Sequence, residues 1–239
     1  MIAKEETKET QSEPAAEKKP YVKKGKAQAK APEVAAPFLP EEWETFVKCD
    51  LRVGKITECE VHPESEKLYI EKVDVAEAEV RTIGSGLQKF VTMEEMMNGE
   101  NVMIWANLKQ KKLGGVPSHG MVMCANSKDQ ENAECQIVRP PAGAVVGERI
   151  QLEGNPILNA PVSNEKAAEL NPKKKVEPKF MALLQTNAEG FACYNGVRLM
   201  TSAGPLTVAS LKNAPISWDI LYSLFNFHLF VYAGVLGFW

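Results

Sequence analysis

Short runs of apolar and β-branched residues alternate with turn-forming residues through the middle of the chain. Strands and turns at this spacing are typical of a small β-barrel or sandwich. Turn residues cluster at 62–65, 84–86, 114–117 and 140–143. The β-prone runs lie at 50–56, 68–75, 80–83, 102–106, 121–125, 135–139 and 149–152.

One stretch follows a helical pattern instead. Thr92 precedes it and Glu95 stands three residues later, which is the spacing of a capping box. The pattern predicts a helix over 92–98, and a short amphipathic piece also precedes the strand at 50–56. We therefore expect an all-β fold with short helices.

The first 42 residues are rich in Lys, Glu, Ala and Pro and hold few large apolar side chains. Such a segment cannot bury enough surface to offset the entropy lost on ordering, so we predict a disordered arm over 1–42. Six lysines lie between Lys18 and Lys30 without an acid among them. They form either a solvated tail or an arm that binds phosphates regardless of sequence.

The C-terminal part divides into two stretches. Residues 155–213 contain short β-prone runs around 191–200, and residues 214–239 are strongly apolar. From Ile220 to Trp239 there are 20 residues without a formal charge, a length that could span a bilayer. Asn226, His228 and the lack of a following basic residue argue against a span. A packed or frayed tail, an altered reading of the gene and a membrane anchor all stay open.

Charge argues for a local nucleic-acid site and against a global one. The whole chain carries a net charge of −3, and residues 43–150 hold 13 Lys and Arg against 17 Asp and Glu. The field of this region does not attract phosphates, so any polyanion site there must be a confined patch.

The five cysteines show no CxxC spacing, and the three histidines are far apart. This pattern favours a reducing compartment and argues against a structural zinc site. The N-terminus has no apolar signal region. No nucleophile and base occur together as a catalytic set, so we expect neither a cofactor, a metal nor an enzyme.

Five blocks of sequence together resemble one family. They are DLRVGKI (50–56), HPESEKLYIEKVDV (62–75), RTIGSGL (81–87), NLKQKKLGGVPSHGMVMCA (107–125) and PPAGAVVGERI (140–150). The family is the tRNA-binding domain of endothelial monocyte-activating polypeptide II, which also occurs as C-terminal extensions of methionyl- and tyrosyl-tRNA synthetases. NPKKK (171–175) and the strands to about Lys212 resemble the extension that eukaryotic members carry.

The resemblance implies an OB-fold barrel over 43–154 and a β-rich extension over 155–213 packed on it, followed by the apolar tail over 214–239. It implies a cytoplasmic monomer in which the extension takes the place of a dimer partner. The implied function is to present tRNA to an aminoacyl-tRNA synthetase, with the methionyl enzyme favoured. A structural adaptor with vestigial RNA binding is the alternative, and membrane contact through 220–239 stays open beside it.

The segment 107–115 supplies the strongest candidates for RNA contact. Lys109, Lys111 and Lys112 stand beside a glycine pair that lets a phosphate approach the backbone closely. The alternative is that these lysines have no role in binding and lie on a solvated loop. The resemblance also places Asn107, Ser118 and Met121 near RNA, although Ser118 would equally suit a turn and Met121 the core.

Two further candidates lie on the strand 50–56. With Val53 pointing inward, we expect Arg52 to point outward, and Lys55 need not share its face. Both are also consistent with ordinary charge on the barrel exterior. Many relatives carry Pro, Met and Arg where this chain has Gln110, Leu113 and Gly114. The missing Arg removes a bidentate phosphate donor, so binding is expected to be weaker or to depend more on the arm.

Overall fold

A computed structural model describes residues 41–127, 129, 133–154 and 167–217. The predicted arm at 1–40 and the apolar stretch from Ile220 lie outside the described residues. The helices are α1 (Glu41–Lys48), α2 (Met93–Met96), η1 (Pro172–Lys174, a 3-10 turn) and α3 (Val176–Met181). The strands are β1 (Leu51–Val61), β2 (Tyr69–Asp74), β3 (Arg81–Ser85), β4 (Asn101–Trp105), β5 (Lys111–Leu113), β6 (Val116–Ser118), β7 (Met121–Val122), β8 (Cys124–Asn126), β9 (Cys135–Ile137), β10 (Gln151–Leu152), β11 (Leu184–Thr186), β12 (Ala192–Tyr194), β13 (Val197–Thr201), β14 (Gly204–Pro205) and β15 (Ile216–Ser217).

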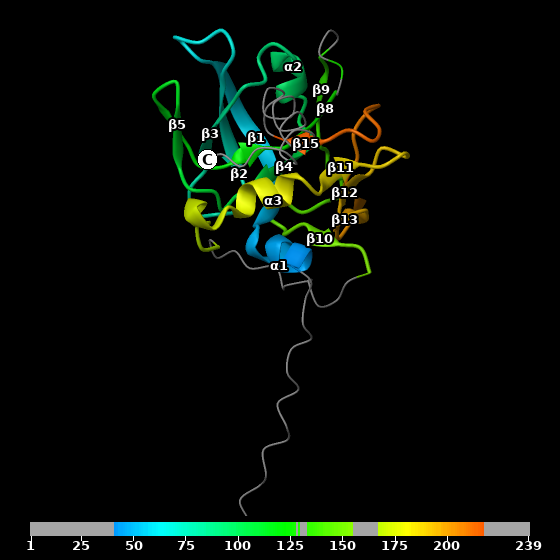
Figure 1. The fold of residues 1–239 in the computed structure, drawn as a ribbon. Coiled ribbons are helices and arrows are strands. Elements are labelled where there is room, and N and C mark those ends of the chain that lie inside the picture. The colour runs from blue at the N-terminus through cyan, green and yellow to red at the C-terminus, as the bar shows by residue number, and fades with distance from the viewer. Residues whose placement is uncertain (1–40, 128, 130–132, 155–166, 218–239) are drawn as a thin grey trace, which may run out of the picture. The chain divides into compact units, whose positions relative to one another are not determined.

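A curved antiparallel sheet forms the first part of the fold, in the order β3-β2-β1-β4-β7 (Figure 1). The first half of β1 pairs with β4, and its second half pairs with β2 across an irregularity between Ile56 and Glu58. Residues 147–150 cover the free edge of the first half, where the Ile150 amide donates to the Leu51 carbonyl at 2.8 Å. The other end of the sheet returns to β3, where the His119 amide donates to the Thr82 carbonyl at 2.8 Å. The sheet is thus a nearly closed barrel, which confirms the predicted all-β fold class.

Gly54 shows why β1 tolerates a glycine at its centre. A Cβ at this position would lie 2.6 Å from Cγ1 of Ile104 and 2.9 Å from Cγ1 of Val73. Both contacts are far inside van der Waals range, so only glycine allows β1 to lie this close to its neighbours.

The interior of the barrel is apolar and is covered by α2. Val73, Ile83 and Ile104 are fully buried there, and Met96 of α2 is packed against the same cluster. The Thr92 hydroxyl accepts a hydrogen bond from the Glu95 amide at 3.1 Å, as the predicted cap requires. The helix is shorter than the predicted 92–98. Gly84 and Ser85, which were expected in a turn, lie inside β3.

Strand β4 is buried on both faces. Val102 and Ile104 point into the barrel, whereas Met103 and Trp105 belong to a second core on its outer side. Residues 176–216 complete that second core, and the sheet β10-β13-β12-β11 joins the end of the barrel to the extension. The extension therefore packs on the barrel as the sequence predicted, and the two share one apolar interface.

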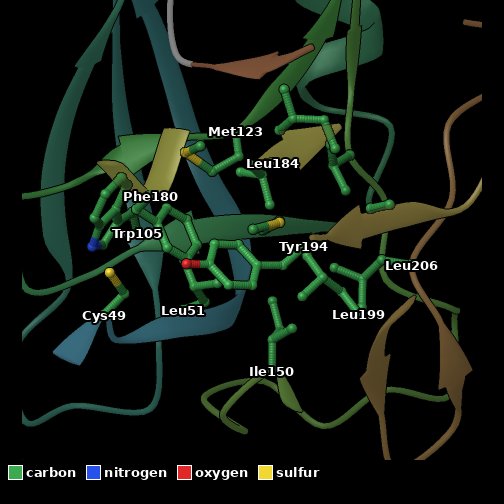
Figure 2. Packing of buried hydrophobic residues seen from close by; sticks show 14 of the residues in the cluster. Cys49, Leu51, Trp105, Met123, Ile150, Phe180, Leu184, Tyr194, Leu199 and Leu206 are labelled. Atoms are coloured by element: carbon green, nitrogen blue, oxygen red, sulfur yellow. The ribbon is translucent and has the colours of Figure 1, made fainter. Parts of the chain in front are cut away.

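Aromatic rings fill the centre of this interface (Figure 2). The rings of Phe180 and Tyr194 stack with centroids 4.8 Å apart, and Trp105 lies 4.7 Å from Phe180 in a tilted arrangement. Phe46 of α1 completes the group at 5.2 Å from Tyr194. Burial of side chains of this size stabilises the fold by about 1.5–3 kcal/mol each. The N-terminal helix, the barrel and the extension are thus joined by one cluster.

The described part of the chain ends with a strand that belongs to the fold. Ile216 and Ser217 of β15 pair with β8, and Ile216 is almost completely buried. Residues 214–217, which the sequence assigned to the apolar tail, are therefore part of the packed extension. No helix within the described ranges is long and apolar enough to cross a membrane.

One carboxyl group is an exception to the apolar interior, because Glu71 shares the inner face of β2 with Tyr69 and Val73. The side chain of Glu71 has no exposed surface and accepts a hydrogen bond from the Ser85 hydroxyl. Burial raises the pKa of Glu71 from its usual 4.5 to about 8, although the Ser85 hydrogen bond lowers it. Its second oxygen, Oε2, has no hydrogen-bond partner among the described residues, as suits a neutral acid better than a charged one.

Replacing Glu71 with Gln is expected to change how stability depends on pH. A raised pKa means that the folded state binds a proton that the unfolded chain releases. The stabilisation is complete below the unfolded pKa and is lost as pH rises towards about 8. In urea denaturation, the free energy of unfolding of Glu71→Gln should rise relative to that of the wild type as pH increases from 4.5 to about 8. The expected rise is up to about 1.4 kcal/mol per pH unit. The exposed Glu58→Gln serves as control, and parallel pH profiles for wild type and Glu71→Gln would refute the assignment.

Candidate nucleic-acid interface

The predicted basic segment forms a hairpin, β5–β6, that projects from the barrel. Lys111 pairs with Ser118 and Leu113 pairs with Val116 across it. Its turn consists of Gly114 and Gly115, both at positive φ. The glycine pair is therefore needed to reverse the chain here.

His62 holds this turn against the barrel. Its Nδ1 accepts a hydrogen bond from the Glu64 amide at 3.1 Å, so the proton lies on Nε2, which donates to the Gly114 carbonyl at 3.0 Å. A Cβ on residue 114 would lie 2.6 Å from that nitrogen. His62 therefore anchors the turn of the hairpin to the loop after β1.

A narrow hollow lies between the hairpin and the barrel, and we call it the barrel cleft. Gly84, Lys109, Lys111, Ser118 and Met121 contribute to its lining. Both lysines are exposed, Met121 is half-buried, and Ser118 lies at the base with 5% of its surface exposed. Four of the predicted contact residues are thus brought together at one site.

The hydroxyl of Ser118 already has two partners. It donates to the Gly120 carbonyl at 3.0 Å and accepts from the Gly84 amide at 3.1 Å. One acceptor position of the oxygen remains. A nucleotide could therefore meet Ser118 only through a donor, such as a ribose 2′-hydroxyl.

A second and wider hollow opens on the other side of the same lysines, and we call it the extension groove. Its volume is about 370 Å³. Lys109 and Lys111 line one wall, and the other wall is formed by residues of the extension: Asn171, Pro172, Lys175, Val176, Glu177 and Pro178. Glu177 lies in this groove with its carboxylate 3.7 Å from Nζ of Lys111. The run of three lysines was visible in the sequence, but its position opposite Lys111 was not.

The structure separates two other predicted lysines from these hollows. Lys112 is exposed on β5 but alternates with Lys111 and Leu113, so it points to the opposite face of the hairpin and lines neither hollow. Lys55 is half-buried, and its ammonium group donates to the carbonyl of Gly99.

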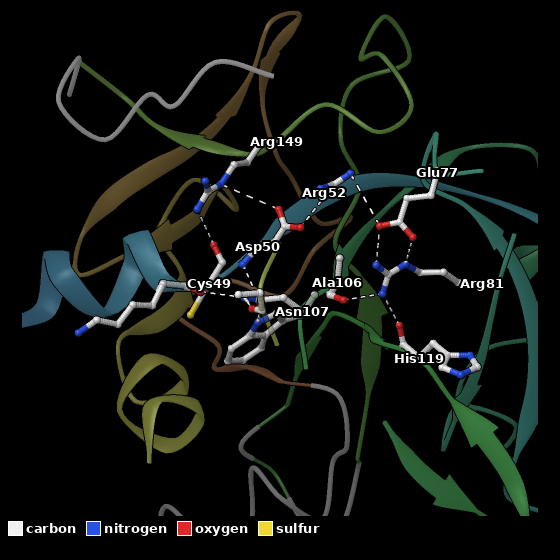
Figure 3. Close-up of polar contacts among 12 residues, drawn as sticks. Cys49, Asp50, Arg52, Glu77, Arg81, Ala106, Asn107, His119 and Arg149 are labelled. Carbon is white, nitrogen blue, oxygen red and sulfur yellow. Dashed lines mark hydrogen bonds and ion pairs between the residues drawn. The ribbon is translucent and has the colours of Figure 1, made fainter. Parts of the chain in front are cut away.

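The predicted outward position of Arg52 is wrong. Only 3% of its side chain is exposed, and its Nε donates to the Asp50 carboxylate at 2.8 Å (Figure 3). Arg149 approaches the same carboxylate at 4.0 Å. Strict alternation fails here because residues 147–150 and the loop after β2 cover this end of β1, so both faces are buried.

A second ion pair continues this buried network. Arg81 makes two hydrogen bonds to the Glu77 carboxylate, at 2.6 and 2.9 Å. The same guanidinium donates to the carbonyls of Ala106 and His119, which lie just before the segments that line the barrel cleft. Arg81 therefore helps to place the lining of the cleft without facing it.

Asn107 is likewise a structural residue and not an exposed contact. It is 2% exposed, and its amide oxygen accepts from the Asp50 amide at 2.9 Å and from Trp105 Nε1 at 3.1 Å. Its amide nitrogen donates to the carbonyls of Lys48 and Ala168 at 2.9 and 3.0 Å. These four bonds use the full capacity of the side chain and leave none for RNA.

Neither a disulfide nor a cluster of metal-ligating side chains occurs among the residues that the structure describes. All five cysteines are free, and burial raises the pKa of the Cys59 thiol to about 12. Within the described ranges, no three His, Cys, Asp or Glu side chains gather as a metal site would need.

Comparison with known proteins identifies the barrel. A family described as "Putative tRNA binding domain" matches residues 51–149. The C-terminal domain of Plasmodium vivax p43 superposes with a TM-score of 0.61 at 32% identity, covering 72% of this chain and 98% of that structure.

Curated relatives contain the same region within longer chains. A probable methionine–tRNA ligase of Oryza sativa subsp. japonica is 41% identical over 172 residues, which is 72% of this chain and 20% of the ligase. The aminoacyl tRNA synthase complex-interacting multifunctional protein 1 of Cricetulus griseus is 39% identical over 73% of this chain and 45% of its own length. The chain thus spans a fifth to just under half of these relatives.

Replacement of Asn107 by Ala is expected to destabilise the fold by about 3–5 kcal/mol, because it leaves several buried polar partners unpaired. Chemical denaturation measures this loss. The exposed neighbour Gln110→Ala is the matched control and should change stability by less than about 0.5 kcal/mol. If Asn107→Ala instead keeps its stability and loses only RNA affinity, the structural role of this amide is incorrect.

Proposed function

The chain belongs to the tRNA-binding domain family, and we propose that it binds tRNA through the barrel cleft without catalysing a reaction. The observation that carries the proposal is the position of Lys109 and Lys111. They are exposed, they lie side by side at the cleft, and they stand above Ser118 and Met121. Lysines supply affinity for phosphate, and the residues beneath them supply contacts to ribose or base.

A confined contact is consistent with the charge of the barrel. Because residues 43–150 carry more acids than bases, long-range attraction contributes little to the encounter with RNA. Affinity then depends on a few lysines at the cleft, and its salt dependence is set by the number of phosphates that they neutralise. Arg52, Lys55 and Asn107 are not part of this contact set, because the structure uses them elsewhere or buries them.

The partner in this proposal is an aminoacyl-tRNA synthetase in the cytoplasm. Relatives include cytoplasmic methionine– and tyrosine–tRNA ligases, in which the matched region is a minor part of the chain. The methionyl enzyme is our preferred partner, since plant methionine–tRNA ligases are 40–41% identical over 172 residues. The chain would increase the local concentration of tRNA near such an enzyme.

We also expect the protein to be a monomer. Met103, Trp105 and Met123 on the outer face of the barrel would form an exposed apolar patch if they were not covered. Residues 176–216 cover them within the same chain, so this face is not available to a second copy.

One observation favours an adaptor as a second candidate function. Two of the matched relatives are named as proteins that interact with the synthetase complex. An adaptor would retain its synthetase when the cleft lysines are removed, whereas its binding of tRNA would be weakened.

The double variant Lys109→Ala and Lys111→Ala is expected to bind tRNA at least tenfold more weakly. The dependence of log K on log salt should become shallower by about 2, since two phosphate contacts are lost. Filter binding at several salt concentrations measures both quantities. Lys212→Ala is the control, because this lysine is exposed and lines neither hollow.

The proposal fails if the wild-type protein binds tRNA no better than a random DNA duplex, or without a salt dependence. Equal losses in the cleft variant and in Lys212→Ala would also reject it, because the contact would then be diffuse.

A further inference from the structure

The extension groove has basic side chains on both walls, although the walls come from distant parts of the sequence. Lys109 and Lys111 belong to the barrel, and Lys175 belongs to the extension. Lys173 and Lys174 belong to the exposed turn η1, which ends directly before Lys175. Three lysines thus line one groove together with the acid Glu177, and two more lysines lie in the turn directly before Lys175.

The lysine turn is fixed at both ends. Before it, the Leu170 amide donates to the Asn107 carbonyl at 2.9 Å. Within it, the Asn171 side chain accepts from the Lys173 amide at 3.0 Å. After it, Val176 is buried in the interface core. The backbone of Lys175 is therefore held in place at the groove wall, and that of Lys173 and Lys174 is fixed in the turn beside it, so little backbone entropy is lost when they meet a ligand.

Lys175 has a backbone conformation that favours glycine. Its φ and ψ are +50° and +38°, the left-handed region that glycine adopts without strain. A lysine at this point carries a conformational cost that the turn itself does not require. The charged side chain of Lys175 lines the groove, and a glycine at this position would have no side chain to place there.

We propose that the extension groove is a second part of the RNA site, in which Lys173–Lys175 bind the phosphate backbone of the RNA that occupies the barrel cleft. Lys109 and Lys111 line both hollows, so one polyanionic strand can pass from the cleft to the groove without leaving basic side chains. This inference rests on the proposed function, since it extends the same RNA contact across the extension.

The first test uses Lys175→Gly in the full chain with unfractionated tRNA as the probe. The substitution removes the charge and relieves the positive-φ backbone, so unfolding by urea should show equal or higher stability. Affinity for tRNA should nevertheless fall by roughly three- to tenfold, with the salt slope lower by about 1. A residue needed only for the turn would not give this combination.

The second test removes a negative charge from the groove, whereas the first removes a positive one. Glu177 is half-buried in the groove and opposes phosphate, so Glu177→Gln should raise tRNA affinity by roughly two- to fivefold at low salt. The matched control is Glu169→Gln, an exposed acid at the beginning of the extension that does not line the groove. No change for Glu177→Gln, or the same change for both variants, contradicts the proposal.

The triple variant Lys173→Ala, Lys174→Ala and Lys175→Ala separates this inference from the proposed function. We expect its salt slope to fall by about 2–3 relative to the wild type. If it binds tRNA as the wild type does while the double variant of Lys109 and Lys111 is weakened, the groove is not part of the site and the cleft remains. If poly-L-glutamate binds as tightly as tRNA and is lost to the same extent in Lys175→Gly, the groove is a site for acidic protein segments and the RNA assignment is overturned.

Discussion

The side-chain amide of Asn107 is the constraint on which the rest of the structure depends. Its four hydrogen bonds join the end of α1, the start of β1, the indole of Trp105 and the first described residues of the extension. The hairpin that carries Lys109 and Lys111 leaves the barrel directly after it. One buried amide therefore sets the distance between the two basic walls, and it does so because each of its donors and acceptors has a partner.

Buried ions fix the other side of the cleft. Removing Arg52 and Arg81 from water costs several kcal/mol each, and their pairing with Asp50 and Glu77 offsets this cost without a large surplus. The benefit is geometric: a guanidinium held by two carboxylate oxygens can direct its remaining donors at the carbonyls of Ala106 and His119. Charges that look like nucleic-acid contacts in the sequence serve here to align the backbone.

Local signals in the sequence predicted the elements well, whereas the roles of individual polar residues needed the structure. The cap at Thr92, the glycine turn of the hairpin and the strands of the barrel depend on neighbours within a few residues, so pattern alone revealed them. Whether Arg52 or Asn107 faces water depends on segments about 60 to 100 residues away that cover them. Lys111 and Lys175 are also far apart in the sequence, so their positions on facing walls of one groove could not be predicted from it.

The double burial of β4 has a consequence for the order of events during synthesis. The barrel sequence leaves the ribosome before residues 176–216, which cover Met103 and Trp105. At elongation rates of about 5–20 residues per second, synthesis of the chain from the end of the barrel to residue 216 takes roughly 3–13 s. Until then, the outer face of the nascent barrel is not covered by the extension. Throughout that interval an apolar, aromatic surface is open to solvent, so the growing chain is most prone to aggregation after its barrel is complete. The extension thus covers the apolar outer face of the barrel and also forms one wall of the extension groove.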